Sequence, residues 1–236
     1  LIPPGWLGIE GLMCGFGDRQ FSAPTGTILL QRQVHGKMVV AAPADGFVRG
    51  DDDYPRAAAE ADALIAACPA TIVGVRTADC VPLLLVAPRA RWSAAVHAGW
   101  RGTVAGIAAE AVRAASGAGI APGELLAALG PSIGPCCYEV SEEVGSGFEQ
   151  AGLPVVAPRS PGSKPHLDLR EANRVLLERD GVPPGNIQSV GPCTRCRSDL
   201  YHSFRAQPQS PGRQISWVGW REPADQTHAR DREPRR

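Results

Sequence analysis

The chain has 236 residues, of which 44% are hydrophobic and 20% are charged, and its formal net charge at pH 7 is 0. This composition excludes disorder over most of the length, and the lack of a basic excess argues against a nucleic-acid partner. No apolar stretch approaches the roughly 18 residues of a membrane span and no signal peptide is recognised, so we expect a cytoplasmic protein without a membrane partner.

The predicted elements follow one another without an internal linker. We therefore expect a poorly structured lead-in over residues 1–11, a single catalytic domain over residues 12–220, and a disordered tail over residues 221–236. Apolar runs bounded by turn residues predict strands, and longer segments with helical periodicity predict helices. The strands are expected at residues 27–34, 38–42, 71–76, 81–87, 92–96, 125–129, 187–190 and 214–218, the helices at 57–68, 103–116, 140–150 and 168–179, and loops at 46–54 and 154–165.

Residues 77–103, TADCVPLLLVAPRARWSAAVHAGWRGT, hold the most informative pattern. Cys80 stands before one apolar run and His97 ends the next, with a Pro-Arg turn between the runs. This predicts a buried hairpin with both reactive side chains at one end, where a site can be rigid yet reachable. A helix is expected to start just after His97, so its free N–H groups together with Arg101 predict an anion pocket beside the histidine.

A second histidine, His35, follows another predicted strand. Two imidazoles and a thiolate are a common zinc set with a fourth position left open, so His35, Cys80 and His97 are candidate metal ligands. The same donors also describe a copper site, although only Met13 and Met38 could serve as an axial methionine. A cytidine-type deaminase would need a glutamate two residues after the histidine, where this chain has Gly99. A Cys80 and His97 nucleophile pair remains the metal-free alternative.

Four further cysteines lie near the ends of later strands, as an adjacent pair at Cys136 and Cys137 and as a C-x-x-C at Cys193 and Cys196. The sequence favours a packing role for the adjacent pair. No second C-x-x-C exists, so the pattern does not favour a structural zinc cluster. The total of seven cysteines is odd in a chain with a large core, which favours reduced thiols.

Several motifs in one order resemble the YfiH/YlmD family, also called the polyphenol oxidase or laccase-domain family and the purine nucleoside phosphorylase family related to the human protein FAMIN. The resemblance covers about residues 13–218. The chain departs from the usual family pattern at Cys14, where a histidine is common, and in the residues around Arg19. The motifs are QVHG at 33–36, TADCVPLLL at 77–85, AVHAGWRGT at 95–103, LGPSIGPCCYEV at 129–140, HLDL at 166–169 and CTRC at 193–196.

The resemblance implies an α+β fold, a single domain of mixed β-sheets layered with helices. It also implies zinc on His35, Cys80 and His97. The implied reaction is phosphorolysis of adenosine, inosine, guanosine or S-methyl-5′-thioadenosine, with adenosine deamination as a side activity. Copper-dependent laccase activity and cysteine-dependent editing of peptidoglycan peptides are the alternatives.

Phosphorolysis needs a group that holds phosphate in line with the anomeric carbon of the ribose. Arg101, the helix start at Gly102 and Thr103, and Arg19 are the candidates for this task, because an arginine can bind two phosphate oxygens at once. Asp79 is the candidate for proton transfer. The expected partners are therefore small molecules, purine nucleosides and phosphate.

Overall fold

The chain is described by a computed structural model that covers residues 1–20, 28–42, 60–66, 68, 70–157, 160, 162–209 and 212–221. The helices are α1 (Trp100–Val104), α2 (Ile107–Gly117), α3 (Glu142–Gln150) and α4 (Leu169–Arg179), and the strands are β1 (Leu12–Phe16), β2 (Ile28–Leu29), β3 (Val39–Ala41), β4 (Ala63–Ala66), β5 (Ile72–Thr77), β6 (Val81–Ala87), β7 (Trp92–Ala98), β8 (Leu126–Leu129), β9 (Val155–Val156), β10 (His166–Leu167), β11 (Ile187–Ser189) and β12 (Gln214–Trp220).

The strands form two main sheets and a small two-stranded one. The larger sheet has the order β11-β8-β6-β7-β4-β3, the second has the order β1-β12-β5-β2, and β10 pairs with β9. Both main sheets are mixed: β8 and β11 are parallel while β6 and β7 are antiparallel, and β2 is parallel to β5 while β12 is antiparallel to it. The mixed α+β fold predicted for the chain is confirmed.

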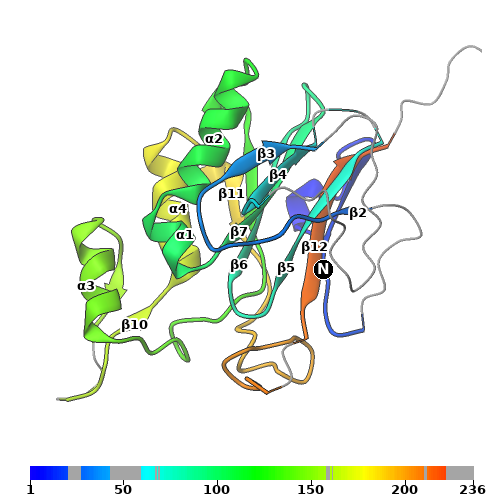
Figure 1. Ribbon diagram of the computed structural model, residues 1–236. Helices are drawn as coiled ribbons and strands as arrows, with labels where there is room; N and C mark the ends of the chain where they lie inside the picture. Colours follow the sequence, from blue (N-terminus) through cyan, green and yellow to red (C-terminus); the bar gives the residue numbers. More distant parts are fainter. Residues whose placement is uncertain are drawn as a thin grey trace, which may run out of the picture.

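The six-stranded sheet is the middle layer of the molecule. Figure 1 shows α1, α2 and α4 along one side of it, and β5 and β12 of the second sheet along the other. Side chains on β6 alternate between these two layers. Leu83 and Leu85 pack in the cluster that includes α2 and α4, whereas Leu84 and Val86 pack in the cluster that includes β5 and β12. A strand buried on both faces reads as a continuous apolar run, which is why the sequence revealed it.

The hairpin of residues 81–98 is confirmed, because Val81 pairs with Ala98 and Pro82 with His97 along an antiparallel ladder. The helix predicted at 103–116 divides into α1 and α2 at Gly106, whose φ of +84° leaves the helical region. The loop predicted at 46–54 lies outside the described residues, as does the predicted tail after residue 221.

The helix predicted at residues 57–68 is wrong within the described residues. Residues 63–66 form β4, which pairs with β7 on one side and β3 on the other. All four of its side chains are buried. The segment is rich in alanine, a strong helix former, but a position between two strands and two apolar layers outweighs that local preference.

Residues 1–11, predicted as a poorly structured lead-in, include a short 3-10 helix at Pro4–Trp6 and contact the core. Trp6 is only 2% exposed and packs in the core between the sheets. The amino group of Leu1 donates a hydrogen bond to the carbonyl of Phe16 at 2.8 Å, and the N–H of Phe16 donates to the carbonyl of Leu1 at 2.7 Å. A buried indole and these two bonds attach the segment to β1. None of the helices in the described residues is long and apolar enough to cross a membrane.

Replacing Leu85 by alanine tests the central position of β6. Leu85 is 0% exposed, so the change should leave a cavity and lower the free energy of unfolding by about 2–5 kcal/mol. Denaturant unfolding followed by circular dichroism measures the loss. Leu7→Ala is the matched control, since Leu7 is 72% exposed and should change stability little. Equal effects of the two changes would contradict the layer assignment.

Candidate metal centre

His35, Cys80 and His97, predicted as metal ligands, come together at one end of the β6–β7 hairpin. Their side-chain donor atoms all lie within 4.8 Å of one another. The two imidazole rings meet edge to face, with centroids 4.8 Å apart. His97 is buried, Cys80 is half-buried and His35 is exposed, so the group is rigid on its inner side and open on its outer side. This is the arrangement of a catalytic metal site that keeps a position free.

Asp62, which the sequence reasoning did not single out, holds both histidines. Its carboxylate lies 2.8 Å from Nδ1 of His97 and accepts the backbone N–H groups of His35 at 3.0 Å and Gly36 at 2.6 Å. Asp62 is 0% exposed. A carboxylate on one ring nitrogen of a histidine fixes the ring and leaves the other nitrogen for a metal. An acidic residue inside the apolar segment ADALIA was the signal that could have revealed it.

Two glycines make room around the trio. A Cβ on Gly99 would lie 3.1 Å from Sγ of Cys80 and 3.2 Å from Cδ2 of His35. A Cβ on Gly102 would lie 2.8 Å from the carbonyl oxygen of Gly36. The segment after His97 can therefore cross directly beside the ligands, which places the start of α1 next to the site.

The ionisable groups of the trio and Asp62 shift one another's pKa values toward the charged forms. Burial alone would raise the pKa of Cys80, but the neighbouring imidazoles of His35 and His97 hold it below its ordinary value. Burial alone would lower the pKa of His97, yet Asp62 and Cys80 raise it. Burial also opposes ionisation of Asp62, whose pKa His97 and the two backbone N–H groups nevertheless lower. A thiolate is thus available as a ligand at neutral pH.

Asp79, predicted for proton transfer, stabilises the turn that carries Cys80 from the second sheet into β6. Its φ is +91°, a region that non-glycine residues rarely adopt. One carboxylate oxygen accepts the hydroxyl of Thr194 at 2.6 Å and the other accepts the backbone N–H of Arg205 at 2.7 Å. Because both oxygens are already engaged, this geometry favours a positioning role for Asp79.

Three side chains with polar or cationic ends adjoin the trio. The guanidinium of Arg101 is exposed and lies 4.6 Å from the ring centroid of Trp100. Burial and the negative charge of Cys80 raise the pKa of Tyr138 to about 12, and the charges of Arg101 and Arg205 also act on it. Arg205 lies 5.2 Å from the ring centroid of Tyr138. Tyr138 and Arg205 were missed by the sequence reasoning, because nothing in the sequence pattern relates either residue to Cys80.

The other predicted phosphate-binding residues have partners within the protein. Thr103 is 0% exposed and its hydroxyl accepts a hydrogen bond from Nδ2 of Asn173 at 2.9 Å. Arg19 donates to the carbonyl of Tyr201 at 3.1 Å and to Oε1 of Gln207 at 2.6 Å, so it holds the loop that contains Arg205. Arg101, in the first turn of α1, is the residue of the predicted set that is exposed. Phosphate binding by Arg19, Gly102 and Thr103 stays a prediction.

The structure also gathers the four later cysteines, for which the sequence favoured packing. Their sulfur atoms all lie within 4.8 Å of one another. The two cysteine motifs are far apart in sequence, but they follow β8 and β11, which are parallel neighbours. The ends of parallel neighbours meet at one edge of a sheet, and this was the available signal. The cluster consists of Cys136, Cys137, Cys193 and Cys196.

Replacing Asp62 by asparagine tests the support of the two histidines. The change removes the negative charge behind His97 and should weaken zinc binding at the trio by about 10- to 100-fold, as the loss of a partner behind a metal ligand does. Competition with a chelator measures the affinity, and a melting curve confirms that the variant is folded. Glu60→Gln is the control, because Glu60 makes an exposed ion pair with Arg32 at 2.9 Å. Unchanged affinity in the Asp62 variant would refute the assignment.

Comparison with known proteins places the chain in a described family. Residues 18–221 match the family described as "Multi-copper polyphenol oxidoreductase laccase". Adenosine deaminase RL5, from an unknown prokaryotic organism, is 38% identical over 195 residues, which are 81% of this chain and 74% of that protein. Purine nucleoside phosphorylase YlmD of Geobacillus stearothermophilus is 37% identical over 196 residues, which are 80% of this chain and 71% of that protein.

Solved structures show the same fold. The crystal structure of YlmD from Geobacillus stearothermophilus matches with a TM-score of 0.78 and 29% identity, over 91% of this chain and 93% of that chain. The crystal structure of a hypothetical protein YfiH from Bacillus licheniformis matches with a TM-score of 0.76 and 30% identity, over 82% of this chain and 74% of that chain. The family that carries the laccase description also includes relatives named purine nucleoside phosphorylase, among them human LACC1. Because the family match, the relatives and the fold agree, the chain belongs to the YfiH/YlmD family of purine nucleoside phosphorylases.

Proposed function

We propose that the protein is a zinc-dependent purine nucleoside phosphorylase with adenosine deamination as a side activity. Its substrates are adenosine, inosine, guanosine and S-methyl-5′-thioadenosine. The observation that carries the proposal is the trio of His35, Cys80 and His97, next to which α1 begins with the exposed cation Arg101 in its first turn. The named activities of the relatives support the same reaction class, since they include phosphorylases and a deaminase.

The reaction replaces one bond at the ribose. The bond from the anomeric carbon to the purine nitrogen breaks, a bond from that carbon to a phosphate oxygen forms, and the base leaves with a proton. The enzyme must hold a dianion next to the sugar, and Arg101 is suited to this because its planar fork donates to two oxygens at once. Arg205 is a second exposed cation near Tyr138.

The donors of the trio fit zinc. One sulfur and two imidazole nitrogens within 4.8 Å make a set of borderline-soft ligands, Asp62 supports one ring, and Gly99 leaves space beside them. Zinc bound there would polarise a substrate oxygen or lower the pKa of a water to about 7, which would also account for deamination. The chain's own part is to orient the nucleoside over the exposed face of His35 and to keep Cys80 ionised.

The family description gives copper oxidation as the second candidate. A multicopper cluster needs many imidazoles, and the chain has five histidines. Among the described residues, His166 is engaged with the carbonyl of Pro135 at 2.6 Å, and no histidine outside the trio belongs to a group that could hold a metal. The cysteine hydrolase alternative needs a free Cys80 thiolate, which metal binding would prevent. The geometry therefore favours the phosphorylase.

Phosphate dependence of base release tests the proposal. Zinc-loaded protein should release free base from adenosine, inosine and S-methyl-5′-thioadenosine only when phosphate is present, and should form the sugar 1-phosphate in equal amount. Chromatography measures the free base that is released, and phosphorus NMR measures the sugar 1-phosphate that is formed. Equal release without phosphate would indicate a hydrolase, and oxidation of a phenol by copper-loaded protein without base release would indicate the laccase.

Replacing Arg101 by glutamine should raise the KM for phosphate by roughly 10- to 100-fold, because hydrogen bonds to a charged group contribute about 1.5–3 kcal/mol. The KM for the nucleoside should change much less. Arg89→Gln is the matched control, since Arg89 is exposed at the turn between β6 and β7, at the other end of the hairpin from the site. A phosphate KM that is unchanged in the Arg101 variant would remove Arg101 from the phosphate site.

Replacing Cys80 by alanine should abolish both zinc binding at the trio and phosphorolysis. Cys80 is half-buried at the start of β6, so the smaller side chain should leave the protein folded. Metal analysis, steady-state kinetics and a melting curve on the same preparation check the three expectations. A variant that kept both the metal and the activity would disprove the ligand assignment.

A further inference from the structure

The cluster of Cys136, Cys137, Cys193 and Cys196 is separate from the site that the proposed function uses. Sγ of Cys196 lies 3.6 Å from Sγ of Cys136 and 3.4 Å from Sγ of Cys137, and all four sulfurs are within 4.8 Å of one another. Four sulfurs at the corners of a tetrahedron around zinc, each bonded at about 2.3 Å, lie about 3.8 Å apart. The cluster thus already has nearly the size of a four-cysteine zinc site.

The backbone holds the two cysteine segments in this position. Residues 130–137 follow β8 and residues 193–196 follow the parallel strand β11, and Ser132 forms a bridge with Cys193. The N–H of Thr194 donates to the carbonyl of Ser132 at 3.0 Å. The N–H of Gly134 donates to Sγ of Cys193 at 3.2 Å. Hydrogen bonds from backbone N–H groups to a sulfur are typical of the surroundings of metal thiolates.

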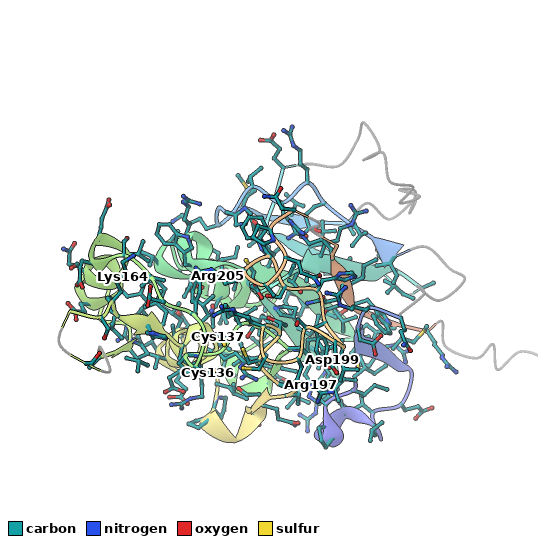
Figure 2. All side chains as sticks on the ribbon, turned by 90° about the horizontal axis from the view of Figure 1, so that it is seen from below. Cys136, Cys137, Lys164, Arg197, Asp199 and Arg205 are labelled. Carbon is teal, nitrogen blue, oxygen red and sulfur yellow. The ribbon has the colours of Figure 1, made fainter. Side chains whose placement is uncertain are left out.

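Packing does not account for the cluster. Cys136 and Cys196 are exposed and the other two are half-buried, whereas cysteines that only fill a core are among the most buried residues. Figure 2 shows Cys136 and Cys137 on the face of the molecule that also presents Arg205. All four cysteines are free, and the two sulfurs nearest to Sγ of Cys196, at 3.6 Å and 3.4 Å, cannot both be its disulfide partner. One ion bound by all four explains why they converge.

We propose that Cys136, Cys137, Cys193 and Cys196 bind a structural zinc ion that ties the loop after β8 to the loop after β11. Four thiolate ligands saturate tetrahedral zinc and leave no open position, so this ion has no part in the chemistry. Zinc displaces the four thiol protons and no oxidation or reduction takes place. The proposal does not rest on the proposed function, because it concerns a different set of residues.

The zinc ion acts on the trio through the protein. Thr194, which lies between the last two cysteines, donates its hydroxyl to the carboxylate of Asp79 at 2.6 Å. Asp79 precedes Cys80, and its carbonyl accepts the N–H of Ile133, from the loop after β8, at 2.9 Å. Both loops that the ion joins therefore contact the residue next to a trio ligand. The structural ion stabilises the turn on which Cys80 is placed.

Counting zinc in purified protein tests the proposal. Wild-type protein prepared under reducing conditions should contain two zinc ions per chain, and Cys80→Ser and Cys196→Ser should each contain one. Cys68→Ser, a change at a half-buried cysteine outside both groups, should retain two. Plasma mass spectrometry measures the metal after dialysis against zinc-free buffer. A single zinc in wild-type protein that Cys196→Ser retains would overturn the proposal.

Cobalt substitution identifies the ligands independently of activity. A four-cysteine site has four metal–sulfur bonds and the trio has one, so Cys196→Ser should lose most of the thiolate-to-cobalt absorption while Cys80→Ser loses about a fifth of it. Melting curves confirm that both variants are folded. Equal absorption in Cys196→Ser and wild type would refute the second site, as would an intact mass two or four hydrogens lower in freshly purified protein. Failure of phosphorolysis would leave these counts unchanged, so the two proposals fail separately.

Discussion

The carboxylate of Asp62 is the interaction on which the candidate site depends. Its oxygens meet the ring of His97 and the backbone N–H groups of His35 and Gly36, and the side chain is 0% exposed. A buried carboxylate is costly unless several donors compensate it, and here the donors are the segments that carry the two histidines. One buried charge thereby holds together two histidines that are far apart in the sequence. It also fixes which nitrogen of His97 can face a metal.

Cys80, the third member of the trio, lies in the turn where the chain leaves one sheet and enters the other. β5 belongs to the outer sheet and β6 to the central one, and the turn between them contains Asp79 with its positive φ. Such a conformation persists only when the surroundings hold it. Thr194 and Arg205 supply those contacts from segments after β11. The candidate site is therefore held by contacts from the first half of the chain and from the segments after β11, and its inner wall is part of the core.

Much of the fold follows from local patterns. The β6–β7 hairpin was predictable because each strand is buried on both faces and so forms a continuous apolar run, which also placed Cys80 and His97 together. The helix predicted over β4 failed because alanine prefers helices locally, whereas pairing with β7 and β3 decided the outcome. No local pattern carries that information. The reaction assigned to the site came from the family resemblance and not from spacing.

The difference between local patterns and long-range contacts also explains which features of the candidate sites were missed. Asp62 is one acidic residue in an apolar segment, and only the packing of three segments around it reveals its role. Cys136 and Cys196 belong to two short cysteine motifs, neither of which makes a four-ligand site alone, and the parallel pairing of β8 with β11 is what joins them. Long-range pairing of strands determines these contacts, and a single sequence read without its fold does not specify them.

We propose above that the trio supported by Asp62 is the metal centre of the active protein. An anomalous difference map at the zinc absorption edge, from crystals of protein with measured phosphorolysis, tests it most directly. We expect a zinc peak bonded to His35, Cys80 and His97, with metal–nitrogen distances of about 2.0–2.1 Å and a metal–sulfur distance of about 2.3 Å. Active protein with no metal at these three residues would contradict it.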